Sequence, residues 1–298
     1  MPDASPLHSL LLPGNMAFYG WPISQCQSPT TPLAVQLQSG IRVLDIRLAV
    51  INSRLIAYHG IYPQRTPFKD IQTAIHDFLT APETCRETIV MFMKQEDFAT
   101  TKPSTFSRTV HREMLDGPGG RDMWFLENRV PNLGEVRGKV VLVSRFGENG
   151  DGWEGGLEGL GIHPTTWPDS AKDGFTWECK DTHVRTHDWY AIPSFLSIPE
   201  KFALSTDILV HPPADTQPQK TLSITFFSAA SWGLGVEGVN SRVGRWLLDL
   251  LSDTEPIPAQ VRLRGWALMD FCSDPEHALA DLLIECNYRG RRAGEEGW

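Results

Sequence analysis

The sequence is poor in cysteine, and its cysteines lack the spacing typical of a metal site or a disulfide framework. The five cysteines are widely scattered, and no two of them form a C-x-x-C pair. An odd number of isolated cysteines is typical of reduced, mostly buried thiols. We therefore expect neither a bound metal ion nor a fold held together by disulfides.

A long apolar segment is also missing near the N-terminus. The short run Leu10–Leu12 is preceded by no lysine or arginine, and it is far shorter than a signal peptide or a membrane span requires. These features predict a soluble, cytoplasmic protein.

Positive charge is scarce as well. Lysine and arginine number 27 against 36 acidic residues, which gives a formal net charge of -9. Such a chain has no basic field to hold nucleic acid or to draw the whole molecule onto an anionic membrane. We expect a monomer with no nucleic-acid partner, whose contact with a membrane surface is local and transient.

What the sequence does contain is enough apolar material for a large core. Its 298 residues are 41% hydrophobic and 21% charged, which is typical of a globular protein. A single α/β barrel commonly has about 250 residues or more. We therefore predict one domain over residues 1–298, with a core over about 6–287 and a polar C-terminal tail over 288–298 that lies on the surface.

Short apolar runs rich in β-branched and aromatic residues recur along the chain. They cover residues 41–46, 55–58, 88–93, 139–144, 222–227 and 266–271. Runs that are apolar on both faces indicate parallel strands buried on both sides. The pattern predicts an α/β fold, a TIM-type (β/α) barrel that is distorted or incompletely closed.

Helical spacing appears between these runs. Ile71, Ile75, Phe78 and Leu79 follow Pro67, which we expect at the first helical position. Residues 240–251 and 277–286 are also predicted to be helical. The long stretch 147–201 has little periodicity, and long irregular segments in compact domains are often functional, so we expect it to form part of the binding site.

Polar residues follow several of the predicted strands. Asp45 and Arg47 end one run, His59 and Lys94 follow the next two, and Asp270 interrupts the last. Each alone is typical of a surface charge or an ion pair. Because active sites of (β/α) barrels lie at the C-terminal ends of the strands, their recurrence there predicts a site.

These segments resemble a known family. The stretches QCQSPTTPLAVQLQSGIRVLDIRL, LIAYHG, ETIVMFMKQED, VRGKVVLVSRFG, HDWY and RLRGWALMDF occur in the order expected of the X domain of bacterial-type and fungal phosphatidylinositol-specific phospholipase C. The resemblance covers about residues 6–287. Its most specific part is GIRVLDIRL followed by YHG about a dozen residues later.

The resemblance implies a metal-independent phosphoryl transfer that uses two histidines and no cofactor. His59 matches the histidine that protonates the departing diacylglycerol oxygen. Arg47 matches the arginine that stabilises the charge at phosphorus, where calcium lies in the animal enzymes. Asp45 matches the carboxylate that supports this histidine, and Asp270 the one that orients the second histidine, the general base.

Four further residues match positions that contact the inositol ring in the family. They are Lys94, Arg145, Asp188 and Tyr190. A polyol requires charged and hydroxyl partners together with an aromatic face. Core packing for Tyr190 and a surface ion pair for Arg145 remain alternatives.

The sequence departs from the family pattern where the general-base histidine is expected. The loop reads LLPGNMAFYGWPISQCQS, with Asn15-Met16-Ala17 in place of the histidine and its acidic neighbour. A positioned general base contributes about 10²- to 10⁴-fold to rate, so its loss separates phosphate binding from turnover. His187 is a candidate substitute. Asp270, left without its partner, is expected to bind water, to pair with Arg47 or to take the proton itself.

Three functions therefore remain open. The chain is a phosphoric diester hydrolase or lyase acting on phosphatidylinositol or a related phosphodiester, a catalytically inactive inositol-phosphate-binding protein, or an acid catalyst repurposed for a small non-lipid substrate. A gene-model error across the base loop is a further alternative. Members of the family that act on bilayers use exposed tryptophans at the barrel mouth, and Trp153, Trp167, Trp177 and Trp232 lie in candidate loops of this chain.

Overall fold

The fold is that of a computed structural model of the chain. It describes residues 1–16, 28, 30–211, 219–231, 234–235, 238–252, 262–274, 278–289, 291 and 293–298. Ala17, Trp232 and His277 lie outside these residues, as does the side chain of Met16.

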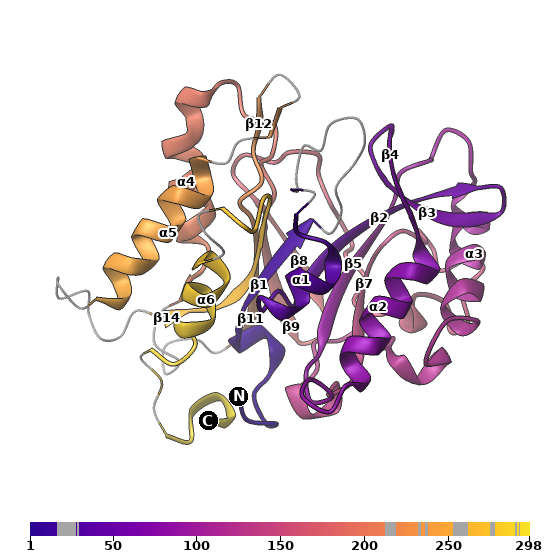
Figure 1. The fold of residues 1–298 in the computed structure, drawn as a ribbon, viewed down its shortest axis with the longest axis horizontal. Coiled ribbons are helices and arrows are strands. Elements are labelled where there is room, and N and C mark those ends of the chain that lie inside the picture. Colours follow the sequence, from indigo (N-terminus) through magenta and orange to yellow (C-terminus); the bar gives the residue numbers. More distant parts are fainter. Residues whose placement is uncertain are drawn as a thin grey trace.

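A curled, mostly parallel sheet forms the centre of the molecule (Figure 1). Its strands are β1 (Leu11–Met16), β2 (Val43–Ile51), β5 (Ile89–Gln95), β6 (Trp124–Phe125), β7 (Val140–Arg145), β8 (Phe175–Cys179), β9 (Thr182–His187), β11 (Lys220–Phe226) and β15 (Gly265–Met269). The strand order is β6-β7-β5-β2-β1-β15-β11-β9-β8, and only the β8–β9 pair in this series is antiparallel. Since the end strands β6 and β8 do not pair with each other, the described sheet is an incompletely closed barrel, as the sequence predicts.

One predicted barrel strand lies elsewhere. The run 55–58 belongs to β3 (Arg54–His59), which pairs antiparallel with the outer half of β2 and with β4 (Tyr62–Pro67). Its apolar residues Leu55 and Ala57 face the outer core rather than the barrel interior. Periodicity could not distinguish a barrel strand from a hairpin strand packed on a helix, because a short apolar run has the same pattern in both.

Side chains alternate between two cores along each barrel strand. Val43, Phe92 and Trp266 belong to an interior cluster enclosed by the sheet, whereas Leu44 and Met91 belong to an outer cluster under the helices. The ring of Phe92 lies about 6 Å from the rings of three other aromatic residues. Toward the C-terminal strand ends, the interior positions become polar.

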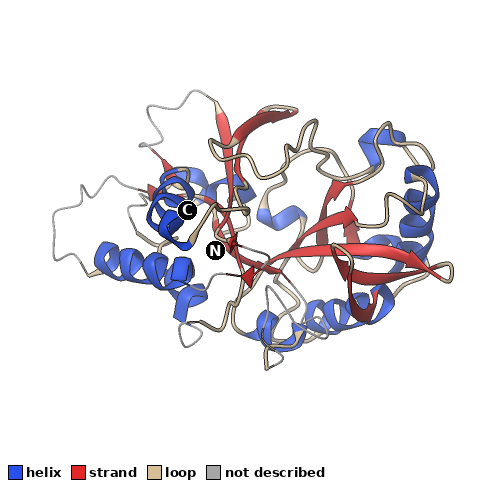
Figure 2. Cartoon of the chain, turned by 90° about the horizontal axis from the view of Figure 1, so that it is seen from above, coloured by secondary structure: helices blue, strands red, loops and turns tan. Residues whose placement is uncertain are grey.

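Helices cover the outside of the sheet (Figures 1 and 2). They are α1 (Leu33–Gln38), α2 (Phe68–Thr80), α3 (Pro103–Leu115), α4 (Ile198–Asp207), α5 (Gly238–Leu251) and α6 (Ala278–Glu285). In α2 the four predicted apolar positions are buried, although Pro67 precedes the helix instead of being its first residue. No helix among the described residues is long and apolar enough to span a membrane.

The stretch 147–201 contains more regular structure than the sequence indicates. It holds the hairpin β8–β9 and the start of α4. Short strands also occur at β10 (Val210–His211), β12 (Ala230–Ser231), β13 (Leu234–Gly235) and β14 (Arg262–Leu263). Strand β9 completes one side of the barrel and carries Asp188 just beyond its end.

The C-terminal tail lies at the end of the molecule where both termini are found (Figure 1). Glu296 pairs with Arg264 at 3.0 Å and with Arg291 at 2.5 Å, and Trp298 packs against the interior cluster. The tail thus covers the N-terminal ends of the strands, opposite the predicted site.

Candidate active site

Three cations lie side by side at the C-terminal end of the barrel. Arg47 of β2 pairs in register with Lys94 of β5, which pairs with Arg145 of β7. Adjacent parallel strands place residues at one register level on the same face of a sheet. Arg47, Lys94 and Arg145 therefore form a row across three neighbouring strands.

Carboxylates hold this row in place. Oδ2 of Asp45 accepts a hydrogen bond from Nε of Arg47 at 3.2 Å, and Oε1 of Glu96 lies 3.4 Å from both Nη1 of Arg47 and Nζ of Lys94. Burial would raise the pKa of Asp45, but the charges of Arg47, Arg145 and Lys94 lower it below its usual value. Asp45 is therefore a buried carboxylate that stays ionised.

Glu96 was not assigned a role from the sequence. It occurs in the stretch KQED, which also contains Lys94. Its position two residues after Lys94, just past the end of β5, is the signal that places it on the same face.

His59 ends β3 and completes this side of the site. Burial lowers the pKa of His59 to about 4; the charges of Arg47 and Lys94 lower it further, and Asp45 opposes them. The imidazole is therefore neutral at neutral pH when the site is empty. Within the described residues no hydrogen bond joins His59 to Asp45, whose Oδ2 accepts from Arg47 instead.

On the other side, residues from the loop before β8 and from the end of β9 meet Arg145. Its guanidinium lies 3.9 Å from the ring centroid of Trp167, whose Nε1 donates to Oδ2 of Asp188 at 2.9 Å. The hydroxyl of Tyr190 donates to Oδ1 of Asp169 at 2.8 Å, and its side chain is partly exposed. This side therefore combines charged groups with aromatic faces.

Asp270 lies directly after β15 and is nearly inaccessible to solvent. Burial raises the pKa of Asp270 to about 7, against a hydrogen bond from Ser228 and the charges of Arg47 and Lys201. It is thus a carboxyl group close to the balance between its two protonation states at neutral pH.

Lys201 is a residue that sequence reasoning missed. It is fully buried on α4, and its Nζ donates to the carbonyl oxygen of Phe226 at 2.5 Å. Burial lowers the pKa of Lys201 to about 7, while Asp188 and Asp270 act in the opposite direction. A lysine on a helix is usually exposed, so no sequence signal distinguishes this one.

Several buried polar atoms of the site have no partner in the described part of the protein. They are Oδ1 of Asp45, Nη1 of Arg145 and Oδ1 of Asp270. Buried polar atoms are nearly always hydrogen-bonded in native proteins. These three unpartnered polar atoms come from three strands and lie at one end of the barrel, which indicates a site that binds a polar ligand.

The position of the expected general base is occupied by the end of β1. Met16 pairs with Asp45 in the strand register, and Ala17 lies outside the described residues. His187 does not join the site: its Nε2 lies 3.2 Å from the carbonyl oxygen of Lys172, and burial lowers its pKa to about 3. Since Asp188 faces the site, strand alternation turns the adjacent His187 away.

An open pocket of about 510 Å³ adjoins the cation row. Its walls include Lys94, Phe98, Arg145, His163 and Trp167. Within the described ranges, no group of three or more His, Cys, Asp or Glu side chains is arranged to hold a metal ion.

The proposed membrane tryptophans are mostly internal. Trp153 and Trp177 are only 7% and 4% exposed, and Trp167 lies beneath Arg145. Trp153 and Trp177 therefore fill space between packed elements and do not form a surface for membrane contact.

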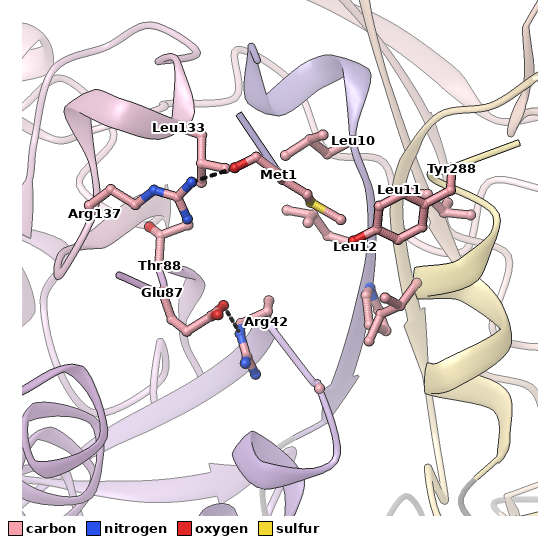
Figure 3. A pocket seen from close by; sticks show the side chains of 13 residues that line it. Met1, Leu10, Leu11, Leu12, Arg42, Glu87, Thr88, Leu133, Arg137 and Tyr288 are labelled. Atoms are coloured by element: carbon pink, nitrogen blue, oxygen red, sulfur yellow. Dashed lines mark hydrogen bonds and ion pairs between the residues drawn. The ribbon is translucent and has the colours of Figure 1, made fainter. Parts of the chain in front are cut away.

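A second cavity, of about 220 Å³, lies at the opposite end of the barrel (Figure 3). Its charged side chains are already paired: Nε of Arg42 lies 2.8 Å from Oε2 of Glu87, and Nη2 of Arg137 donates to the carbonyl oxygen of Met1 at 2.7 Å. This cavity therefore lacks the orphan polar atoms of the first site.

Comparison with known proteins gives three consistent findings. Residues 23–146 match the family model for the phosphatidylinositol-specific phospholipase C X domain. The 1-phosphatidylinositol phosphodiesterase of Listeria monocytogenes is 28% identical over 152 residues, 48% of this chain and 46% of the relative. That of Staphylococcus aureus strain Newman is 30% identical over 116 residues, 38% of this chain and 36% of the relative.

Solved structures show a similar fold over nearly the whole chain. The phosphatidylinositol-specific phospholipase C of L. monocytogenes has a TM-score of 0.69 and 23% identity, with 96% of both chains covered. That of S. aureus has a TM-score of 0.74 and 19% identity, covering 96% of this chain and 95% of the other. The sequence matches span at most about half the length of the curated relatives, whereas the barrel fold extends further.

Proposed function

Because residues 23–146 belong to the phosphatidylinositol-specific phospholipase C X-domain family, we propose that this chain cleaves phosphatidylinositol or a related phosphodiester at the C-terminal end of its barrel. The curated relatives are 1-phosphatidylinositol phosphodiesterases. The observation that carries the proposal is the row of Arg47, Lys94 and Arg145, with unpartnered buried atoms around it.

Arg47 is the group proposed to bind the phosphodiester. A guanidinium matches the geometry of phosphate oxygens and keeps its charge at all relevant pH values. Asp45 and Glu96 contact the guanidinium at 3.2 and 3.4 Å and fix its direction before substrate arrives. A pre-oriented cation of this kind stabilises the charge that builds up at phosphorus.

His59 is the proposed general acid. It is neutral in the empty site, because burial and neighbouring cations hold its pKa at about 4. An anionic phosphodiester beside the imidazole offsets the charge of Arg47 and so raises the pKa of His59. Substrate binding thus favours the protonated imidazole that the leaving oxygen requires.

Asp270 is the proposed proton acceptor in place of the missing histidine. Its pKa of about 7 suits a general base at neutral pH, and its Oδ1 has no other partner. The inositol 2-hydroxyl gives its proton to Asp270 as its oxygen bonds to phosphorus. The bond from phosphorus to the diacylglycerol oxygen breaks, and that oxygen takes a proton from His59, leaving diacylglycerol and a cyclic inositol phosphate.

The test is to incubate the purified protein with phosphatidylinositol and to measure cyclic inositol phosphate and diacylglycerol. Product should form with the wild-type protein and fall by about 10²- to 10⁴-fold in His59→Ala. His76→Ala, on the outside of α2, is the matched control and should retain the wild-type rate. Absence of product from the wild-type protein would refute the proposed activity.

A second candidate is a protein that binds the headgroup without turnover. The row of cations proposed to bind phosphate is present, whereas the histidine base is absent. This combination favours headgroup binding without turnover. It predicts that inositol phosphate binds to the wild-type protein, that Arg47→Ala abolishes this binding, and that no product forms. The same assay, run beside a calorimetric titration, distinguishes the two functions.

Membrane contact belongs to the same proposal. The S. aureus structure comes from work on the membrane binding of that enzyme. A lipid substrate must reach the C-terminal strand ends from a bilayer, so the rim around them is where this chain would meet a membrane.

A further inference from the structure

Lys201 is a buried charged residue beside the candidate site, and the steps proposed above give it no part. It lies on α4 and is fully buried. Lysine is almost never fully buried unless its ammonium group is paired. Among the residues that the structure describes, no carboxylate forms an ion pair with Nζ, which donates instead to the carbonyl oxygen of Phe226 at 2.5 Å. A structural ion pair therefore does not account for the burial of Lys201.

Hydrogen bonds fix Lys201 over the end of β11. Oγ of Ser205 donates to the carbonyl oxygen of Lys201 at 2.7 Å, and Oγ1 of Thr225 donates to the carbonyl oxygen of Ser205 at 2.9 Å. Together with the bond from Nζ to Phe226, these contacts join α4 to the last two residues of the strand. The ammonium group therefore has a fixed place at the C-terminal end of the barrel.

This place lies between two carboxylates of the site, because β11 is flanked by β9 and β15 in the sheet. On β9, Asp188 directly follows the residue that pairs with Thr225. On β15, Asp270 comes two residues after the one that pairs with Phe226. The charges of Asp188 and Asp270 both favour the ammonium form of Lys201. The lysine thus acts at short range on two carboxylates without an ion pair to either.

Of these two carboxylates, Asp270 is the one whose ionisation is finely balanced. Burial raises the pKa of Asp270 to about 7, and the charge of Asp45 adds to this rise. A hydrogen bond from Ser228 and the charges of Arg47 and Lys201 oppose it. Arg47 already pairs with Asp45 at 3.2 Å, whereas Lys201 pairs with no described carboxylate. The charge of Lys201 is therefore the one left to act on Asp270.

The other ionisable neighbours of Lys201 do not cancel its charge. Burial lowers the pKa of His187 to about 3, and Lys201 lowers it further, so this imidazole is neutral. Glu200, the neighbour of Lys201 on α4, is exposed and pairs with Lys172 at 2.6 Å. The pKa of Lys201 itself is about 7. Its ammonium form is therefore present below neutral pH, where Asp270 would otherwise take up a proton.

We propose that Lys201 is a positioning residue of the cleavage reaction, whose buried ammonium group keeps Asp270 in the ionised form that accepts the proton of the inositol 2-hydroxyl. The inference rests on the proposed function, in which Asp270 is the general base. Lys201 is fully buried, so it acts through Asp270 and not on the substrate. Without its charge Asp270 holds a proton more tightly, and a higher pH is needed before the carboxylate can act as a base.

The experiment compares the pH dependence of kcat/KM for phosphatidylinositol between the wild-type protein and Lys201→Met. Methionine keeps an apolar stem in the buried space and removes the charge. The variant should be about tenfold slower than wild type at about pH 6 and nearly equal to it at about pH 9, because Asp270 is ionised in both proteins at the higher pH. A loss of the same size at every pH, or no loss at all, would overturn the inference.

Two further variants assign this effect to the charge. The amide of Lys201→Gln can still donate a hydrogen bond toward Phe226 but is neutral, so this variant should show the same pH dependence as Lys201→Met. A wild-type profile in Lys201→Gln would overturn the role of the charge. The matched control, Lys220→Met, removes a lysine that pairs with Asp181 at the opposite end of β11 and should keep the wild-type profile. A control profile displaced as far as that of Lys201→Met would refute the assignment to Lys201.

A measurement without substrate distinguishes failure of this inference from failure of the proposed function. Carbon-13 NMR of labelled aspartate carboxyl groups, assigned with Asp270→Asn, should show a higher pKa for Asp270 in Lys201→Met than in wild type. With labelled lysine, the pKa of Lys201 should be lower in Asp270→Asn, a variant that keeps the lysine and so does not depend on how Lys201 variants fold. Unchanged pKa values would overturn the inference whatever the activity. Both changes without any cleavage by wild type would refute the proposed function and leave the coupling of the two residues intact.

Discussion

His59 lies where burial and two cations oppose its protonated form, with a pKa of about 4. We expect the pKa of His59 to rise when inositol phosphate binds, because the anion adds negative potential beside the imidazole. An NMR titration of the ring protons measures this shift. In Arg47→Ala the pKa should be higher than in wild type without any ligand, since one opposing charge is removed. An unchanged pKa in the presence of saturating ligand would contradict the proposed role of His59.

We expect substitution of Asp270 to raise the stability of the protein at high pH and to abolish its activity. Its pKa is raised from 3.8 to about 7, so the folded state binds its proton more tightly than the unfolded state. Wild-type stability should therefore fall as the pH rises through this window, by roughly 4 kcal/mol at most. Asp270→Asn lacks this loss and should be more stable than wild type at pH above about 7, and similar to it below about 4. Urea unfolding across this range measures the difference, while the cleavage assay should show lost activity.

The residues of the site differ in how far the sequence could predict them. Arg47, Lys94 and Asp270 follow apolar runs, and strand periodicity alone places them at one end of a barrel. Lys201 could not be found this way, because its burial depends on how α4 packs over the end of β11. Trp167 was considered only as a membrane contact, since its stacking on Arg145 joins residues from distant parts of the chain.

Among the elements, continuous apolar strands were predictable and the hairpins were not. The runs at β2, β5 and β7 are buried on both faces, and the sequence shows this directly. Strand β9 has Val184 as its one apolar residue and lies within a Gly- and Asp-rich stretch, so its sequence resembles that of a loop. The register of β3 against β2 follows from the turn between them and not from composition.

Strand β1 depends on a close approach at Gly14. A Cβ atom there would lie 2.7 Å from Cβ of Val43 and 3.0 Å from the carbonyl oxygen of the same residue. We expect Gly14→Ala to lower the free energy of unfolding by about 1–3 kcal/mol, measured by urea denaturation. Gly238→Ala is the control: its Cβ would meet only Cδ1 of Ile198 at 3.6 Å, an ordinary contact. Equal effects of the two changes would contradict this packing argument.

At the scale of the whole molecule, ion pairs attach the C-terminal tail to the end of the barrel where the strands begin. Glu296 neutralises Arg264 and Arg291, whose side chains are only 3% and 4% exposed. Glu296→Gln should destabilise the fold by about 3 kcal/mol, because it removes the ion-pair partner of two buried cations. Chemical denaturation tests this, with Glu83→Gln on the surface as the control. No change in the Glu296 variant would show that the tail is not held by these pairs.

The gap between β6 and β8 has a consequence for how the sequence of such a protein can evolve. Strands β6 and β8 do not pair with each other, and the connection that runs from β7 to β8 joins the sheet at an isolated bridge, where Ile162 pairs with Val143. This connection supplies Trp167 and part of the pocket beside the cation row. Insertions and substitutions there can reshape what the pocket admits while the paired strands keep their register. Substrate preference and foldability are thereby free to evolve separately on this side of the barrel.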